Sequence, residues 1–234
     1  MRAFGPVPSR RLGKSLGVNN IPPKTCSYAC VYCQVGRTTH ARVERSEFYD
    51  PEELAAEIRE KVERARRIGE PIDYITFVPD GEPTLDLHLG REIELLRPLG
   101  VKIAVISNAS LIRRPDVREE LALADWVSLK VDSADEEHWL KINRPVRTLS
   151  LAGIFEAMIR FAKDYDGDLV TETMLVRGLN DDEDELEGIA GFLSILTPGV
   201  AYLSVPTRPP VEPWVEIPDI ETINRAYHIL SGKV

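Results

Sequence analysis

Short apolar runs alternate with amphipathic segments along most of the chain. The apolar runs, bounded by Pro, Gly or acidic residues, predict strands at 14–21, 73–79, 101–107, 126–132, 168–176 and 200–206. Apolar residues at helical spacing predict helices at 50–70, 87–99, 115–124, 135–142, 150–165, 183–196 and 219–231. The first of these helices has the start signals Asp50, suited to the N-cap, and Pro51 directly after it.

This alternation predicts an α/β fold, because strands that are each followed by a helix become parallel neighbours joined by right-handed crossovers. The near-continuous apolar runs fit strands that are covered on both faces. A closed barrel of eight such units needs about 250 residues, so six units in 234 residues predict an open (β/α)6 partial TIM barrel. A doubly wound flat sheet is the structural alternative. We expect one domain over 1–234, with 1–49 supplying the first strand and a cysteine-bearing loop and 50–234 the remaining βα units.

Polar segments rich in Gly and Pro follow the predicted strands. In either fold, ligands bind at the carboxyl ends of parallel strands. The first of these polar segments is the one that bears the cysteines. The others are DGEPT at 80–84, SNAS at 107–110, KVDS at 130–133, RGLND at 177–181 and PTRPP at 206–210. Their convergence predicts a single active site at this rim.

The composition narrows the class of protein. Fractions of 43% hydrophobic and 29% charged residues are typical of globular domains. No apolar run reaches the roughly 18 residues that span a bilayer, and the first residues lack the apolar core of a signal peptide. We expect a cytoplasmic protein with reduced thiols and no membrane contact.

Charge is distributed unevenly along the chain. Residues 1–46 carry a net charge of +7, although the whole chain has −9, which leaves −16 for the remainder. The basic segment also holds all three cysteines. Such a segment suits a phosphate, a nucleic acid or an acidic redox partner, and ordinary solvated surface charge is the alternative.

The cysteines Cys26, Cys30 and Cys33 lie together in TCSYACVYCQVG. Three thiols cannot all pair with one another, so we expect no disulfide framework. A structural zinc ion needs four ligands, and His40 could supply the fourth. An iron–sulfur cubane usually takes four thiolates. With three thiolates, one iron would stay open, as in catalytic metal sites that keep a vacant position.

The spacing C-x-x-x-C-x-x-C, with Tyr32 before the last cysteine, resembles the signature of the radical S-adenosylmethionine (SAM) superfamily. The resemblance implies that Cys26, Cys30 and Cys33 hold a [4Fe–4S] cluster whose open iron binds SAM. It further implies that an electron from the cluster cleaves SAM to methionine and a 5′-deoxyadenosyl radical, which abstracts hydrogen from a substrate. The family fold is an open (β/α)6 barrel, which the strand count predicts independently.

Other segments resemble the SAM-binding elements of this superfamily. DGEPT is similar to the GGEP segment of the family, although Asp80 stands where the first glycine usually stands. The implied SAM-binding residues are Tyr32, Gly81, Glu82, Pro83, Ser107, Asn108, Lys130 and Asp132. An ordinary turn at 80–84 and at 107–110, and a surface ion pair at Lys130 and Asp132, are the structural alternatives.

FGPVPSRRLGKSLGVNNIPPK, with the later INRP, VRGLND and VPTRPP, resembles a subgroup of Fe–S oxidoreductases related to the tRNA wyosine (4-demethylwyosine) synthases. Wyosine synthases carry extra cysteines for a second cluster, and this chain has only three cysteines. The candidate substrate contacts are Arg10, Arg11, Arg144, Asn180 and Arg208. Arginines at the rim would suit a phosphate or carboxylate. Ordinary ion pairs, and for Asn180 a helix cap, are the alternatives.

The sequence leaves the substrate open among a small molecule or peptide, a tRNA, and a protein activated to a glycyl radical. The implied electron donor is a flavodoxin or ferredoxin, for which the basic residues Arg37, Arg42 and Arg45 would form a docking face. Two functions of other classes remain as alternatives. One is a zinc-stabilised binding module that uses the three cysteines and His40, and the other is an iron–sulfur electron carrier without a substrate.

Overall fold

The fold is known from a computed structural model that describes residues 2–233. Within this range the main element is a seven-stranded sheet in the order β1-β2-β5-β6-β7-β8-β9. Its strands are β1 (Ala3–Ser9), β2 (Gly13–Val18), β5 (Tyr74–Phe77), β6 (Lys102–Ser107), β7 (Trp126–Lys130), β8 (Asp168–Met174) and β9 (Val200–Ser204). The strands from β2 to β9 are parallel, as predicted, and β1 pairs antiparallel with β2.

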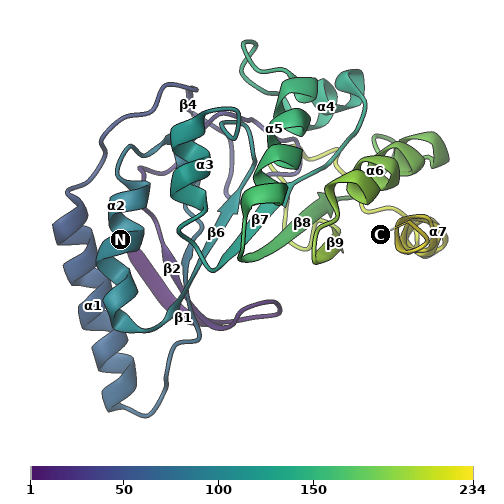
Figure 1. The fold of residues 1–234 in the computed structure, drawn as a ribbon. Helices are drawn as coiled ribbons and strands as arrows, with labels where there is room; N and C mark the ends of the chain where they lie inside the picture. Colours follow the sequence, from purple (N-terminus) through teal and green to yellow (C-terminus); the bar gives the residue numbers. More distant parts are fainter. Residues whose placement is uncertain (1, 234) are drawn as a thin grey trace.

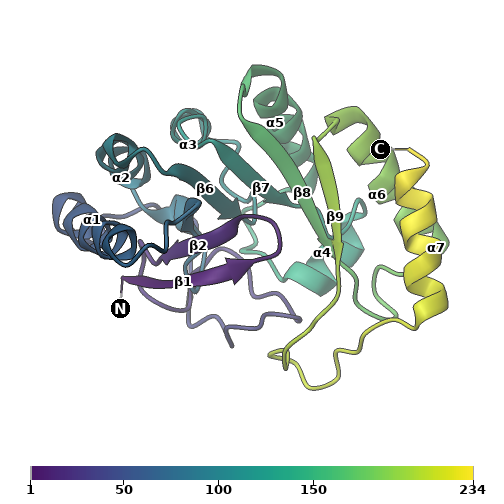
Figure 2. The same cartoon turned by 90° about the horizontal axis from the view of Figure 1, so that it is seen from below.

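Helices connect the parallel strands and cover one side of the sheet. They are α1 (Pro51–Arg67), α2 (Leu89–Leu96), α3 (Pro115–Leu121), α4 (Glu136–Asn143), α5 (Leu151–Asp164), α6 (Glu183–Leu196) and α7 (Ile220–Ser231), with short 3₁₀ turns η1 (Pro83–Leu85) and η2 (Arg97–Leu99). Figure 2 shows α1, α2, α3, α5, α6 and α7 in an arc around the convex side of the curved sheet. A doubly wound sheet would carry helices on both faces. The fold is therefore the predicted partial barrel, open between its two edge strands.

Local sequence signals explain where the helices begin. Asp50 caps α1 by accepting a hydrogen bond from the Glu53 amide (2.8 Å), as its position before Pro51 predicts. Side chains at the N-cap position likewise accept a hydrogen bond from a backbone N–H in the first turn of α4, α5, α6 and α7. The apolar stripe of α1, which includes Leu54 and Ile58, is fully buried in the main core that also holds the outward-facing residues of the parallel strands.

The antiparallel strand β1 was not predicted. Its sequence, AFGPVPS, contains two prolines and a glycine, which argue against a strand in the centre of a sheet. At the edge of a sheet these residues are tolerated, because one side of the strand needs no ladder hydrogen bonds. The turn from β1 to β2 carries Arg10 and Arg11, so these residues lie at the amino end of β2. The Arg11 side chain nevertheless extends to Ser204, the last residue of β9, so it reaches toward the carboxyl ends of the strands.

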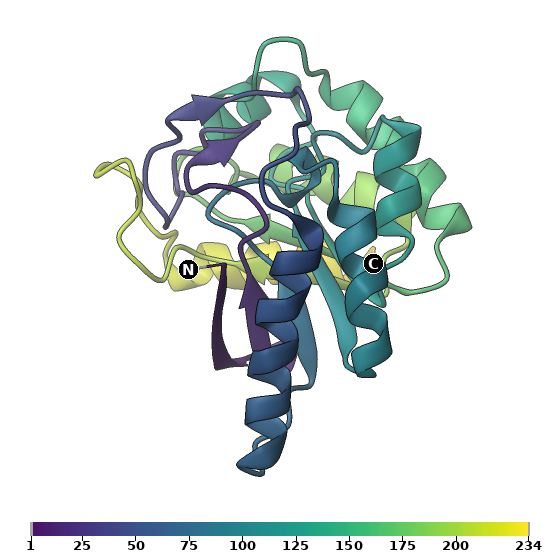
Figure 3. The ribbon, with the colours of Figure 1, turned by 90° about the vertical axis from the view of Figure 1, so that its left-hand side faces the viewer.

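Two segments from opposite ends of the chain meet above the sheet. The cysteine loop, residues 22–41, contains the short parallel strands β3 (Thr25–Cys26) and β4 (His40–Ala41). The strap, residues 205–219, follows β9 and returns to this loop. The Val211 amide donates to the Cys33 carbonyl (2.9 Å), and the Glu212 amide donates to the Val31 carbonyl (3.2 Å). Figures 2 and 3 show the yellow-green strap beside the purple cysteine loop.

The same end of the molecule carries α4, and Figure 1 shows both α4 and β4 at the top of the view. In the part of the chain that the structure describes, no helix has both the length and the apolar character to cross a bilayer.

Candidate active site

The three cysteines are free thiols, each half-buried in the cysteine loop. The Asn108 amide donates to Cys26 Sγ (3.5 Å), and the Asn143 amide donates to Cys30 Sγ (3.4 Å). Cys30 and Cys33 line a cavity of about 200 Å³. Burial raises the pKa of the Cys30 thiol to about 12, and the charge of Asp132 adds to this effect. Thiolates at this position therefore need a bound cation to compensate their charge.

The three thiols do not all lie as close together as the ligands of one metal ion. Tetrahedral zinc, with bonds to sulfur of ~2.3 Å, brings the sulfurs to roughly 3.8 Å from one another. Among residues 2–233, the single group of at least three ligating side chains whose ligand atoms all lie within 4.8 Å is Asp135, His138 and Glu185. The cysteines do not form such a group, alone or with His40, whose exposed ring contacts Thr39 Oγ1. The arrangement therefore argues against the zinc module.

Gly81 allows the DGEPT turn to lie directly against the cysteine loop. The Glu82 amide donates to the Thr25 carbonyl (3.1 Å), and the Lys24 amide donates to the Asp80 carbonyl (2.7 Å). A Cβ atom at Gly81 would lie 1.9 Å from the Thr25 carbonyl oxygen, so a larger residue cannot fit without moving the backbone. The turn that resembles the SAM-binding segment is thus joined to the strand that begins the cysteine motif.

Glu82 joins this turn to the end of β6. Its buried carboxylate accepts hydrogen bonds from Ser107 Oγ (2.7 Å), Thr84 Oγ1 (2.6 Å) and the backbone N–H of Asn108 (2.7 Å). Burial raises the pKa of Glu82, although these hydrogen bonds partly oppose the shift. Because Asn108 in turn reaches Cys26, a continuous chain of hydrogen bonds links the turn, the strand end and the first cysteine.

Asp132 forms a second junction, between the cysteine loop, α4 and β8. It accepts hydrogen bonds from Tyr32 Oη, from the Asn143 side chain (2.7 Å) and from the Met174 amide (2.8 Å). Burial raises the pKa of Asp132, while Lys130 and these donors oppose the shift. Asp132 is 2% exposed. The alternative of a surface ion pair is therefore wrong for this residue.

Charged side chains cross the interior of the barrel. Glu172 of β8 pairs with Lys130 (3.2 Å) and with Arg11 (3.0 Å), and Arg11 also donates to Ser204 Oγ (3.1 Å) and lies over the Tyr202 ring. Burial opposes ionisation of Glu172, but Lys130 and Arg11 outweigh it and hold the pKa of Glu172 below its usual range. Sequence reasoning missed Glu172, although an acid within the apolar run DLVTETMLV was a usable signal.

A larger cavity, of about 500 Å³, brings together three of the five candidate substrate residues. Arg10, Arg11 and Arg208 line it, together with Glu172, and Ile106 and Met174 supply an apolar part of its wall. Gln34, the residue after Cys33, also lines this cavity, so the cavity reaches the cysteine loop.

The other two candidates lie elsewhere. Arg144 lines the smaller cavity beside Cys33 and pairs with Glu212 of the strap. Asn180 is completely buried, and its side chain bonds the Asp132 carbonyl (2.6 Å), the Met174 carbonyl (3.0 Å) and the Val176 amide (2.8 Å). Asn180 therefore connects the ends of β7 and β8 and offers no free polar atom to a substrate.

One of the basic residues expected to dock an electron donor is not available at the surface. The Arg45 side chain is 2% exposed and pairs with Asp116 (2.8 Å) and Glu120. Arg45 thus joins the cysteine-bearing segment to α3, and that part of the docking expectation was wrong. Arg37, with a side chain 76% exposed, remains accessible.

Comparison with known proteins decides the family. Residues 20–188 match the model of the radical SAM superfamily. This chain belongs to the radical SAM superfamily. It is accordingly an enzyme that uses a [4Fe–4S] cluster and SAM for radical chemistry, and it needs a reductant and a substrate.

Individual relatives of this radical SAM enzyme differ in length and in their named activities. UPF0026 protein MJ1312 of Methanocaldococcus jannaschii is 50% identical over 229 residues, which are 98% of this chain and 71% of that protein. An S-adenosylmethionine-dependent nucleotide dehydratase of Lacinutrix mariniflava is 28% identical over 139 residues, 57% of this chain and 28% of that protein. A structure of TYW1 with a lysine-pyruvate adduct superposes with a TM-score of 0.69 over 93% of this chain and 73% of TYW1, at 18% identity. At that identity the likeness shows the fold alone.

Proposed function

We propose that Cys26, Cys30 and Cys33 hold the [4Fe–4S] cluster of this enzyme, and that the DGEPT turn and the end of β6 form the SAM site beside it. The observation that carries this proposal is the hydrogen-bonded chain from Glu82 through Asn108 to Cys26. It places the segments that resemble SAM-binding elements directly at the cysteine motif. When bound, the cluster supplies the electron that cleaves SAM to methionine and a 5′-deoxyadenosyl radical.

The predicted SAM residues divide into two groups by what their polar atoms already bind. The side chains of Tyr32, Glu82, Ser107, Asn108 and Asp132 are hydrogen-bonded within the protein. We assign these five to positioning the site. The backbone of 81–83 then contacts SAM, and carbonyl oxygens of the turn are suitable acceptors for its ammonium group. Lys130, paired with Glu172, borders the site from inside the barrel.

The substrate site of this proposal is the 500 Å³ cavity. Its volume is that of a small-molecule pocket, which favours a small molecule over a tRNA or a protein. Arg11 is committed to Glu172. Arg10 and Arg208 are exposed, and within residues 2–233 neither forms an ion pair with an acid. Two arginines facing one cavity suit a phosphate or carboxylate group. The nucleotide named as the substrate of the Lacinutrix relative carries such groups, so we propose a phosphorylated small molecule as the substrate.

The cluster assignment is tested by anaerobic reconstitution with iron and sulfide. We expect roughly four irons per chain, an EPR signal of the reduced cluster that SAM changes, and 5′-deoxyadenosine after dithionite is added. Cys30→Ala should abolish cluster retention and SAM cleavage. Val35→Ala, in the same loop at an exposed position, should behave like wild type. One tightly bound zinc per wild-type chain, or full SAM cleavage by Cys30→Ala, would overturn the assignment.

The substrate assignment is tested by binding of the four common ribonucleoside triphosphates, measured by calorimetry on the SAM-bound enzyme. Arg10→Gln and Arg208→Gln should each weaken the binding of the best ligand by about tenfold. Each substitution removes a charged hydrogen bond worth about 1.5–3 kcal/mol, and a water molecule at the vacated position replaces part of this energy. Arg59→Gln, an exposed arginine on α1, is the matched control. Equal affinities for all three variants would exclude this cavity as the anion site.

A further inference from the structure

Asn143, the last residue of α4, connects the second cysteine with the Asp132 junction. Its side chain is 1% exposed, and its amide donates to Cys30 Sγ (3.4 Å) and to Asp132 Oδ2 (2.7 Å). An amide group has two N–H donors. One points to Asp132, and the other lies between Cys30 Sγ and Tyr32 Oη, which is also 3.4 Å from the amide nitrogen. The sequence analysis did not single out this residue, because INRP gives no sign that its asparagine faces a sulfur.

The backbone around Asn143 holds this amide in place. The Ala29 amide donates to the Asn143 carbonyl (3.0 Å), and the Val31 amide donates to the Ile142 carbonyl (2.9 Å). These two bonds lie on either side of Cys30 in the sequence. The end of α4 and the cysteine loop therefore form one hydrogen-bonded unit, in which the distance from the amide to the sulfur is fixed.

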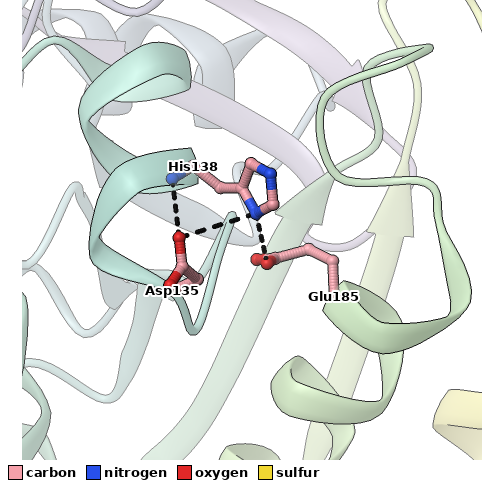
Figure 4. A group of neighbouring side chains, drawn as sticks. All are labelled: Asp135, His138 and Glu185. Carbon is pink, nitrogen blue, oxygen red and sulfur yellow. Dashed lines mark hydrogen bonds and ion pairs between the residues drawn. The ribbon is translucent and has the colours of Figure 1, made fainter.

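The start of α4 is fixed as well. Asp135 caps the helix by accepting from the His138 amide (2.9 Å), and His138 Nδ1 lies 2.8 Å from Glu185 of α6. Figure 4 shows the His138 ring turned toward Glu185. The other carboxylate oxygen of Glu185 accepts from the Ala134 amide (3.0 Å). Since these ligating atoms already bind one another and the backbone, we interpret the group as an anchor between α4 and α6, not as a metal site.

A hydrogen bond to a cluster sulfur changes how easily the cluster accepts an electron. Reduction adds one electron from the donor and increases the negative charge on the thiolate ligands. A donated N–H stabilises this more negative state, so it raises the reduction potential. Asn108 makes a similar bond to Cys26 (3.5 Å). The two asparagines thus place one amide donor on each of two of the proposed ligands.

We propose that Asn143 is a positioning residue that raises the reduction potential of the cluster through its hydrogen bond to Cys30. This inference rests on the proposed assignment of the cluster to the three cysteines. Through Asp132 and Tyr32, the same amide also fixes the cysteine loop against the ends of β7 and β8. Reduction of the cluster and the geometry of the SAM site thereby depend on one side chain.

The test is an EPR-monitored redox titration of the reconstituted enzyme without SAM. Asn143→Leu removes both donors at similar volume, and Asn143→Ser keeps a polar group too short to reach the sulfur. Both variants should hold iron and show a midpoint potential more negative than that of wild type. Trp139→Phe is the control, because Trp139 lies on the same helix, is as deeply buried and contacts Tyr28 of the cysteine loop through its ring. Its potential should equal that of wild type.

The possible outcomes separate this inference from the proposed function. Wild-type protein that binds no iron–sulfur cluster would overturn the proposed function itself. Variants at Asn143 that hold the cluster at the wild-type potential would overturn only the inference. If neither variant retains iron, pulsed EPR of the reduced Asn108→Leu protein, labelled with ¹⁵N-asparagine, decides. A ¹⁵N coupling from Asn143 is expected, and its absence would refute the hydrogen bond.

Discussion

Two carboxyl groups are buried together behind the DGEPT turn. Asp86 follows η1, Glu92 belongs to α2, and the two side chains interact. Burial raises the pKa of Glu92 to about 9, and the negative charge of Asp86 adds to this effect. A hydrogen bond from the Asn20 side chain opposes the shift only in part. A proton on Glu92, shared with Asp86, satisfies both groups, so we expect Glu92 to be neutral at pH 7.

The stability of the protein should therefore depend on pH through Glu92. Its pKa is about 9 in the folded protein and 4.5 in an unperturbed chain, so the folded state binds more protons between these values. The free energy of unfolding then falls as the pH rises through this window. Glu92→Gln keeps a neutral group, and urea unfolding from pH 6 to 9 should show a flatter profile for this variant.

Glu94→Gln is the matched control for this experiment, because Glu94 is exposed on the same helix. This variant should retain the wild-type slope. If Glu92→Gln and wild type lose stability equally between pH 6 and 9, Glu92 is already ionised and the shared proton does not exist.

At the scale of single residues, the sequence predicted the chemical role of a residue better than its place in the fold. The cysteine spacing is a property of a few neighbouring residues, so it could be predicted, whereas the need for glycine at position 81 comes from the Thr25 carbonyl, which is distant in the sequence. The bonds of Glu82 to Ser107 and Asn108 join strands that are distant in the sequence. Such distant partners decide whether a charged residue contacts a ligand or links two elements inside the protein. The periodicity of the sequence does not reveal these partners.

At the scale of elements, the strap acts on the cysteine loop through backbone hydrogen bonds. Val211→Pro removes the N–H that binds the Cys33 carbonyl. We expect faster hydrogen exchange in the cysteine loop and a several-fold faster loss of iron to a chelator. Val211→Ala keeps this N–H and should resemble wild type. Unchanged exchange in Val211→Pro would show that the strap lies on the loop without holding it.

Elements with strong local signals were predicted, and those that depend on distant partners were not. α1 and α6 have a capping residue and an apolar stripe, and each was predicted within a few residues of its observed bounds. β3 and β4 comprise two residues each and exist only because the cysteine loop folds back on itself. The strap has no periodic pattern at all. Its sequence contains several prolines, which indicate a loop but not the surface on which it lies.

At the scale of the whole molecule, the cysteine loop keeps exposed positive charge at Arg37, whereas Arg11 and Arg45 are paired with acids. An acidic donor protein should therefore be steered to the end of the enzyme that carries the cysteine loop. Replacing Arg37 and Arg42 by Glu should slow reduction of the cluster by flavodoxin at low salt, and the difference should shrink at high salt. Stopped-flow absorbance at several salt concentrations measures this. The double variant Arg59→Glu, Arg64→Glu on α1 is the control, and an equal effect from it would exclude specific docking.

The contact between strap and cysteine loop has a consequence for the order of biosynthesis. The cysteines leave the ribosome long before the strap, which is made after β9. At about 5–20 residues per second, the interval between them is roughly 10–40 s. During this time the three thiols lack the backbone partners that later cover them. Iron loaded in this interval would meet a loop without its final shape, so the cell gains from inserting the cluster after the strap has been made.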